Sequence, residues 1–220
     1  MKKTLLSAIA IMVFISLSVT GCGHDHRDHS PTIVTQILSD PAIDGDIVQT
    51  SLTTTVTQGN TQSVFAGIDP LSGAEYRAFL DFPLTGADGV PGNAFIVSAT
   101  LDIEINDAFF QSQGDTIPIR IELVSIPGLT LVPDDFNRTI QPAIAFTTIL
   151  PPISSADIGN HVSVDVTSLM VRAQSLGLLD FQVRILEDLG VVVPGLIEIN
   201  DTTDPTLRGA LAPLLQVEYL

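Results

Sequence analysis

The chain has 220 residues, of which 25 are acidic and 9 are basic, with one cysteine and no tryptophan. A formal net charge of −16 argues against nucleic acid as a partner, since phosphate binding needs clustered lysine and arginine. One cysteine can form neither an internal disulfide nor a thiolate metal site. Because 45% of the residues are hydrophobic and only 15% are charged, the sequence is no disordered acidic tail. Its length favours one all-β domain or two small domains.

The N-terminus has the pattern of a secretion signal. Lys2 and Lys3 follow Met1, and an apolar run over 5–19 is interrupted only by three serines. This run is at the upper length of a signal-peptide core and is short for a bilayer-spanning helix. Small residues then lead to Cys22, and the arrangement resembles the bacterial lipobox, whose cysteine is lipidated and becomes the mature N-terminus. We predict a lipoprotein signal peptide over 1–21 and lipidation at Cys22; the alternatives are a buried free cysteine or an uncleaved anchor helix.

Lipidation of Cys22 implies that the protein is attached to a membrane without crossing it. In lipoproteins a diacylglyceryl thioether and an N-terminal acyl chain enter one leaflet, and stable anchoring needs more than one chain. The residue after Cys22 is Gly23. By resemblance to Gram-negative lipoproteins, an aspartate at this position would indicate retention in the inner membrane. The resemblance therefore implies a lipid-anchored protein of the cell envelope, with the outer membrane favoured in a Gram-negative cell. Without 1–21, seven basic residues, all arginine, stand against 25 acidic ones.

Three of the four histidines lie in the segment 22–31, which we expect to tether the lipid to the folded domain. His24, His26 and His29 are interspersed with acidic residues. Histidine-rich segments of this kind ligate zinc, copper or nickel, so a transition-metal tract is one interpretation. Because nothing in the segment would order the ligands, we favour a solvated tether.

From position 32 onward, apolar and polar residues alternate with a period of two, which predicts half-buried strands. The clearest stretches are 78–82, 101–105, 117–123, 162–166, 181–185 and 215–219. Weaker candidates are 32–38, 47–56, 62–68, 144–149 and 195–199. Turn-forming residues separate them, as at 44–46, and 167–176 has the apolar spacing of a short helix that Gly177 would end. We predict an all-β fold for 32–220: a single jelly-roll-like antiparallel β-sandwich with one short helix.

Four segments of this region follow one another in an order typical of one module. They are YRAFLDF at 76–82, VSATLDI at 97–103, VDVTSL at 164–169 and APLLQVEY at 212–219. Together they resemble the DNRLRE-type modules, also called disaggregatase-related jelly-roll domains, of bacterial and archaeal surface proteins. The likeness covers about residues 44–220 and implies a fold similar to carbohydrate-binding modules, and hence sugar binding. Where family members often carry tryptophan, this chain has Ala173 and, near mid-chain, at most Phe136.

Sugar recognition normally uses flat aromatic side chains that also carry a polar group. The chain has no tryptophan, and its two tyrosines, Tyr76 and Tyr219, fall on predicted strands. An exposed Phe79, Phe109 or Phe110 would serve instead, although phenylalanine is more often packed in a core. A row of aromatic side chains on one sheet face would support sugar binding, and a smooth polar face would contradict it.

Catalytic motifs are sparse in the sequence. Beyond the tether only His161 remains as a histidine base, and it follows an expected Gly-Asn turn. We find no Gly-x-Ser-x-Gly elbow, no His-Glu-x-x-His motif and no phosphate-binding glycine loop. A hydrolase would need two facing carboxylates in a cleft beside His161, and we expect no enzyme activity.

Aspartate outnumbers glutamate by 19 to 6, and many of the aspartates lie in expected turns. Calcium binds six to eight oxygen atoms of carboxylates and carbonyls, which loops supply readily. Asp44 and Asp46 flank a flexible glycine, and Asp201 and Asp204 lie in a second cluster, so these four are candidate ligands of a structural calcium ion. The alternative is ordinary turn chemistry, in which each side chain bonds the local backbone and no cofactor is required.

These features favour a lipid-anchored, non-catalytic interaction or structural module of the cell envelope. Such a module would present a rigid sandwich to an envelope protein or a polysaccharide. The alternatives are a carbohydrate-binding surface lipoprotein and, third, an atypical hydrolase.

Overall fold

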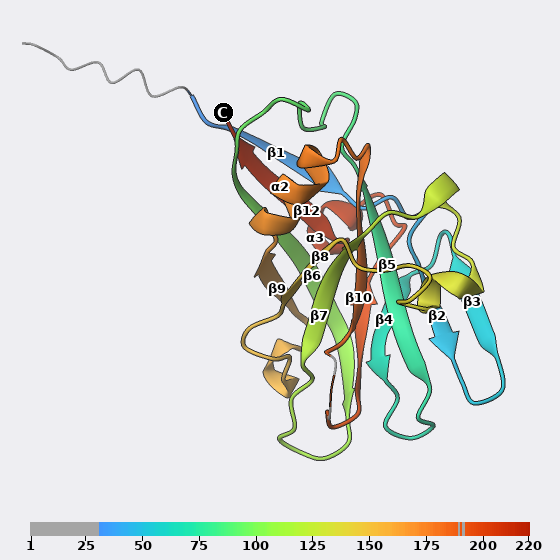
Figure 1. Ribbon diagram of the computed structural model, residues 1–220. Coiled ribbons are helices and arrows are strands. Elements are labelled where there is room, and N and C mark those ends of the chain that lie inside the picture. The colour runs from blue at the N-terminus through green and yellow to red at the C-terminus, as the bar shows by residue number, and fades with distance from the viewer. Residues whose placement is uncertain (1–30, 189, 191) are drawn as a thin grey trace, which may run out of the picture. The chain divides into compact units, whose positions relative to one another are not determined.

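The alternating stretches pair into one curled antiparallel sheet (Figure 1). The computed structural model describes residues 31–188, 190 and 192–220, so the predicted leader, Cys22 and the tether histidines lie outside the described residues. Residues Thr32–Leu220 form one unit. The strands are β1 (Ile33–Leu38), β2 (Gly45–Gln49), β3 (Thr54–Gln58), β4 (Ser63–Ile68), β5 (Glu75–Pro83), β6 (Ile96–Phe110), β7 (Ile119–Val124), β8 (Ala145–Thr148), β9 (Asn160–Asp165), β10 (Asp180–Glu187), β11 (Gly195–Asn200) and β12 (Leu214–Tyr219).

The long strand β6 lets the sheet curl into two layers. Hydrogen bonds follow the path β1-β12-β6-β11-β4-β5-β10-β7-β8, with β2 and β3 attached to β5 and β9 attached to β6. The first part of β6 pairs with β12 and β9, its last part pairs with β11, and the register shifts in the pairings with β12 and β11. Such irregularities bend a strand and increase its twist. The two ends of the sheet then pack against each other, which confirms the predicted all-β sandwich.

The core lies between the inner faces of these two layers. One layer supplies Leu80, Phe82, Ile121, Leu123, Val183 and Ile185, and the other supplies Leu101, Ile103, Ile105, Ile197, Leu215 and Val217. All twelve side chains come from the stretches whose alternation predicted strands, and almost none of their surface is exposed. Burying one such side chain stabilises the fold by about 1.5–3 kcal/mol. The period-two pattern therefore indicates which face of each strand is buried in the core.

The predicted short helix is α2 (Thr167–Ser175), which packs against β6. Its first amide donates a hydrogen bond to Asp165 Oδ1 at 2.9 Å, and Gly177 after its end has a φ of +65°. Glycine adopts this left-handed conformation without strain. A second helix, α3 (Arg208–Leu211), is a single turn without an apolar repeat, which is why the sequence predicts only one helix. Loops contain the 3-10 turns η1 (Pro127–Leu129), η2 (Pro133–Phe136) and η3 (Ser155–Asp157). In the described part of the chain, no helix is long and apolar enough to span a membrane.

Two predicted features near the N-terminus differ from the structure. The sequence predicts one strand over 47–56, whereas β2 and β3 form a hairpin there. Its turn is closed by Thr50, whose Oγ1 accepts the amide of Thr53 at 3.0 Å, and threonine also favours strands, so the pattern hides the turn. The prediction of a turn at 44–46 is wrong, because β2 begins at Gly45. A Cβ at Gly45 would lie 2.2 Å from a backbone oxygen of β3, so only glycine fits.

The outer face of β5, β7 and β10 is covered by the segment 125–144, which the alternation does not predict. Side chains of this segment pack on the strands in a second, smaller core. Its members are Ile47, Phe79, Val124, Ile126, Leu131 and Phe136. As a result Glu122 and Arg184, whose positions in the pattern predict solvent exposure, are fully buried.

Candidate functional site

A hollow of about 280 Å³ opens over β4, β5, β6 and β11. Its lining consists of Phe65, Asp69, Leu71, Tyr76, Phe109 and Leu196. The rings of Phe65 and Tyr76 have centroids 5.8 Å apart and planes inclined at 55°. Phe109 is 44% exposed and Leu71 is 98% exposed. Exposed aromatic and aliphatic side chains therefore gather around one depression on the sheet.

Gly67 lies between two of the residues that line this hollow. In the sheet it lies between Leu196 of β11 and Tyr76 of β5. Its φ is +121°, and a Cβ here would lie 2.1 Å from the carbonyl oxygen of Gly195. Only glycine fits this position, so Gly67 lets β4 and β11 approach closely beside Leu196 and Tyr76.

Two polar groups stand at the edge of the hollow. Asp69 accepts hydrogen bonds from the hydroxyl of Ser72 and from the amide of Leu71, and both lower the pKa of Asp69. The pKa of Tyr76 is raised by burial and by the charges of Asp69 and Asp46, so its hydroxyl stays protonated. No hydrogen bond to that hydroxyl occurs among the described residues. The site thus combines an ionised carboxylate and a free phenol group with apolar rings.

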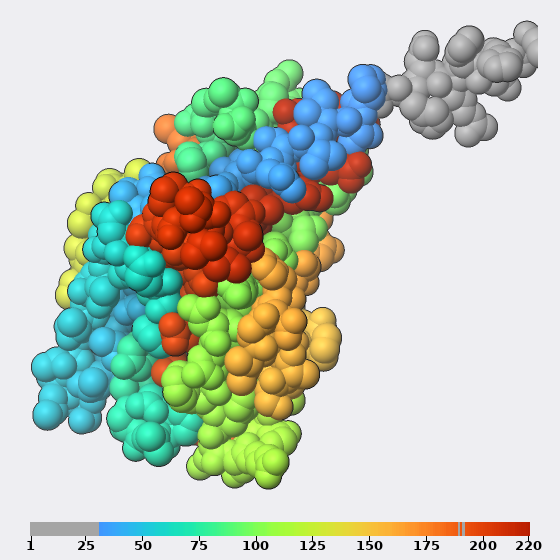
Figure 2. Space-filling model, turned by 180° about the vertical axis from the view of Figure 1, so that it is seen from behind, coloured from blue at the N-terminus to red at the C-terminus, as the bar shows by residue number. Residues whose placement is uncertain are grey.

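The hollow lies at the end of the domain opposite to the start of β1. In Figure 1, β1 begins at the top, where the chain enters the domain, and the β4–β5 connection is at the bottom. The reverse view in Figure 2 gives the same arrangement. That connection contributes Asp69 and Leu71 to the hollow.

The other aromatic candidates from the sequence have different positions. Phe79 belongs to the smaller core, Phe110 packs against the main core, and Tyr219 is buried. Only Phe109 of the three phenylalanine candidates lines the hollow. Phe65 was not among the candidates, although its place between two buried residues on the stretch 62–68 could have indicated an outward side chain.

The structure brings together two of the four candidate calcium ligands. Asp44 immediately precedes β2, Asp201 immediately follows β11, and neither side chain is exposed. Burial, and then the charge of Asp201, raise the pKa of Asp44 well above its ordinary value. Burial raises the pKa of Asp201 to about 6, although the charge of Arg208 opposes this shift.

The other two candidate ligands bond elsewhere. Asp46 Oδ2 accepts the amide of Phe65 at 3.2 Å, and burial raises the pKa of Asp46 to about 6. Asp204 is exposed, and its Oδ1 accepts the amide of Thr206 at 2.8 Å, the turn chemistry given as the alternative. Among the described residues, no group of three or more His, Cys, Asp or Glu side chains is arranged for a metal. The tether histidines are outside that range.

His161 and Ser163 both bond the carboxylate of Asp102 and do not form a nucleophile–base pair. His161 Nδ1 lies 2.6 Å from Asp102 Oδ2, and the hydroxyl of Ser163 donates to the other oxygen of the same carboxylate at 2.7 Å. A hydrolytic triad places the histidine between serine and carboxylate. Here the carboxylate lies between serine and histidine, so the arrangement orients side chains on β6 and β9 without activating a nucleophile.

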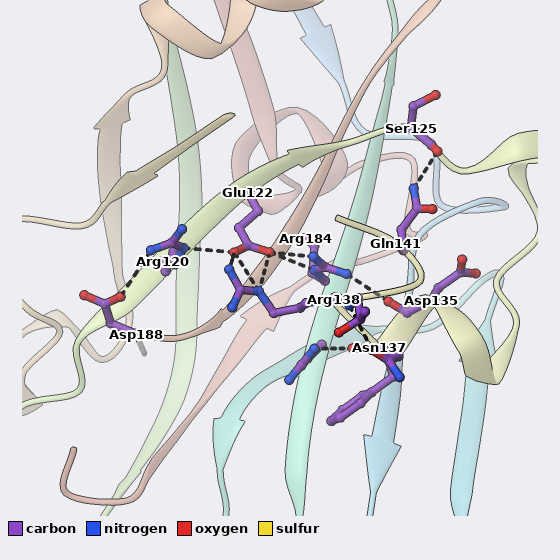
Figure 3. Close-up of polar contacts among 12 residues, drawn as sticks. Arg120, Glu122, Ser125, Asp135, Asn137, Arg138, Gln141, Arg184 and Asp188 are labelled. Atoms are coloured by element: carbon purple, nitrogen blue, oxygen red, sulfur yellow. Dashed lines mark hydrogen bonds and ion pairs between the residues drawn. The ribbon is translucent and has the colours of Figure 1, made fainter. Parts of the chain in front are cut away.

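Three arginines surround the buried Glu122 beneath the segment 125–144 (Figure 3). Glu122 accepts hydrogen bonds from Arg184 Nη2 at 2.6 Å, Arg138 Nη2 at 2.6 Å and Arg120 Nε at 2.9 Å. Burial alone would raise the pKa of Glu122, but the bonds and charges of Arg138 and Arg184 outweigh it and lower the pKa. This network ties the covering segment to β7 and β10, and its carboxylate has no free oxygen for catalysis.

Comparisons with known proteins leave the family of this chain unassigned. No family model matches the chain, and no curated protein matches it. The resemblance to DNRLRE-type modules stays a prediction.

Proposed function

We propose that this protein is a lipid-anchored, non-catalytic interaction module of the cell envelope that binds its partner through the aromatic hollow. In this proposal Cys22 carries the lipid and 22–31 is the tether. The observation that supports it best is placement: the β4–β5 connection, whose Asp69 and Leu71 line the hollow, lies at the end of the domain opposite to the start of β1 (Figure 1). A domain tethered through its N-terminus would present this hollow away from the membrane.

Carbohydrate binding is the second candidate, and the chemistry of the hollow favours it. The rings of Phe65, Tyr76 and Phe109 offer apolar faces for the C–H faces of a sugar ring. Asp69 accepts hydrogen bonds from sugar hydroxyls, and the hydroxyl of Tyr76 both donates and accepts. A protein partner would instead cover the fully exposed Leu71 with apolar side chains.

Binding by the full chain, purified in detergent, to a glycan array and to envelope proteins in a pull-down tests this function. We expect saturable binding that Phe109→Ala weakens at least about tenfold, because losing a central aromatic anchor typically costs about 2 kcal/mol or more. The matched control is Phe95→Ala, since Phe95 is 69% exposed and pairs with Leu220 outside the hollow. Binding to glycans alone would select the second candidate. Equal binding by both variants would refute a role for the hollow.

A further inference from the structure

Three buried oxygen atoms meet between the start of β2 and the end of β11 without hydrogen-bond partners. They are Asp44 Oδ2, Asp201 Oδ1 and the Oγ of Ser39. The three side chains are 0%, 0% and 2% exposed. An unpaired polar group costs roughly 1–3 kcal/mol when buried, and more when it is charged. With both carboxyl groups ionised, the facing oxygen atoms of Asp44 and Asp201 repel each other, so the pair needs either a shared proton or a cation.

The remaining oxygen of each carboxylate is already used. Asp44 Oδ1 accepts the amide of Asp81 at 2.7 Å, and Asp201 Oδ2 accepts the hydroxyl of Thr61 at 3.3 Å. These bonds fix both carboxyl groups, so the two free oxygen atoms cannot turn away to find other donors. Each carboxylate therefore keeps one oxygen in position for a further ligand.

The protein neutralises only part of the charge at this point. Two carboxylates face each other, and the charge of Asp40 adds to the repulsion at Asp201. The nearest cation is Arg208, whose Nη1 lies 3.9 Å from Asp201 Oδ1, beyond hydrogen-bond distance. Its Nη1 and Nη2 donate instead to the backbone oxygens of Thr202 and Ser39. One positive charge at that distance leaves negative charge uncompensated.

Segments that are distant in the sequence close over the pair. Figure 2 shows the red segment that contains α3 lying against the blue and cyan segments near the start of the domain. The amide of Asp201 donates to the backbone oxygen of Gln62, and Arg208 bonds the backbone of Ser39, so the contact is direct. An ion bound here would hold the ends of β1 and β11 and the start of β2 together.

We propose that Asp44, Asp201 and Ser39 bind one calcium ion. Carboxylate and hydroxyl oxygens are hard ligands, and calcium accepts irregular sets of six to eight oxygen atoms, completed by backbone carbonyls and water. Magnesium demands a near-ideal octahedron and gives up its water reluctantly, so it fits a fixed, asymmetric pair less well. The site is independent of the aromatic hollow and goes beyond the proposed binding function.

Calcium added to the chelator-treated full chain in detergent tests the site. We expect about 10 mM CaCl₂ to raise Tm by about 5 °C and the same concentration of MgCl₂ to raise it less, because a ligand that binds only the folded state stabilises it. Asp44→Asn and Asp201→Asn should each abolish most of the calcium-dependent shift. These variants also remove the like-charge repulsion, so they are expected to fold without calcium.

Asp204→Asn is the matched control, because Asp204 lies in the same loop but is exposed and bonds only its own turn. It should keep the full calcium-dependent shift. The proposal is overturned if calcium leaves Tm unchanged, or if Asp201→Asn retains the shift. It is also overturned if only a proton stabilises the pair, so that Tm rises as the pH falls while calcium has no effect at any pH.

Discussion

Replacing Glu122 with glutamine tests how the segment 125–144 is held on the sheet. Glu122 Oε2 accepts two bonds from Arg184, at 2.6 and 3.0 Å, while Oε1 accepts the bonds from Arg138 and Arg120. Glutamine keeps the shape of the side chain, but it has no charge, and its amide nitrogen would face arginine donors. The substitution therefore leaves Arg184 buried without a counter-ion.

The size of the effect follows from burial. Removing one partner of a buried ion pair costs about 3–5 kcal/mol. Glu122 and Arg184 are both 0% exposed, so this range applies to them, whereas the partly exposed Arg138 can turn toward water. A domain of this size shifts its Tm by about 2–4 °C for each kcal/mol. We therefore expect Glu122→Gln to lower Tm by roughly 6–20 °C.

Thermal unfolding followed by circular dichroism, at constant pH and calcium, measures this shift. Glu198→Gln is the control, because Glu198 is half-buried on β11 and accepts one long bond, from Asn106 at 3.4 Å; it should change Tm by less than about 2 °C. Replacing Glu122 and Arg184 together with leucine should recover at least about half of the loss, because no charge of that pair stays buried. A fall below about 3 °C for Glu122→Gln would refute the reasoning.

Lowering the pH from about 8 to about 5 in chelator should raise Tm, since burial raises the pKa of Asp46 to about 6 and that of Glu187 to about 7. Because these folded-state pKa values lie above the unfolded-state values, the protonated carboxyl groups stabilise the fold at low pH, and this contribution to stability is lost as the pH rises through 6–7. A flat or falling Tm on acidification would contradict the pKa shifts. Gly67→Ala should cost about 2 kcal/mol or more in urea unfolding, because its φ is +121° and a Cβ would meet backbone. Gly73→Ala, with a positive φ but open space, should cost only about 1 kcal/mol, so equal losses would contradict the steric argument. Cys22→Ser should move the protein from the membrane fraction to the soluble fraction on an immunoblot, and continued retention would rule out the lipid anchor.

Period-two alternation predicted the strands because one face of each is removed from water. The stretches 78–82 and 181–185 became β5 and β10 on this basis. The same pattern placed Arg184 outward and could not show that 125–144 would cover it. Covering this face depends on contacts between distant segments, and only the concentration of arginines on facing strands hinted at it.

The candidate sites, too, depend on contacts between distant segments that the sequence pattern does not reveal. The sequence singled out Asp44 and Asp201 for their residue type, and it grouped Asp44 with Asp46 and Asp201 with Asp204 by proximity along the chain. Strand pairing decides which of them meet: β2 pairs with β5 and β11 pairs with β4, so the ends of the two strands converge. Gly67 was unremarkable in the sequence, because its role depends on a neighbouring backbone that only the sheet brings within reach.

The proposed calcium site and the proposed envelope location support each other through affinity. Calcium sites of extracellular modules have dissociation constants of about 10⁻⁴–10⁻³ M, and sites with few carboxylates and a nearby cation belong at this weak end. The proposed site has two carboxylates, and the nearby cation is Arg208, whose Nη1 lies 3.9 Å from Asp201 Oδ1. Such a site fills only where calcium is abundant, as it is outside the cytoplasm. We expect titration calorimetry to give a Kd in this range and Arg208→Gln to tighten it up to about tenfold, because a repelling charge is removed. Submicromolar binding by the unaltered chain, or weaker binding by Arg208→Gln, would contradict this electrostatic account.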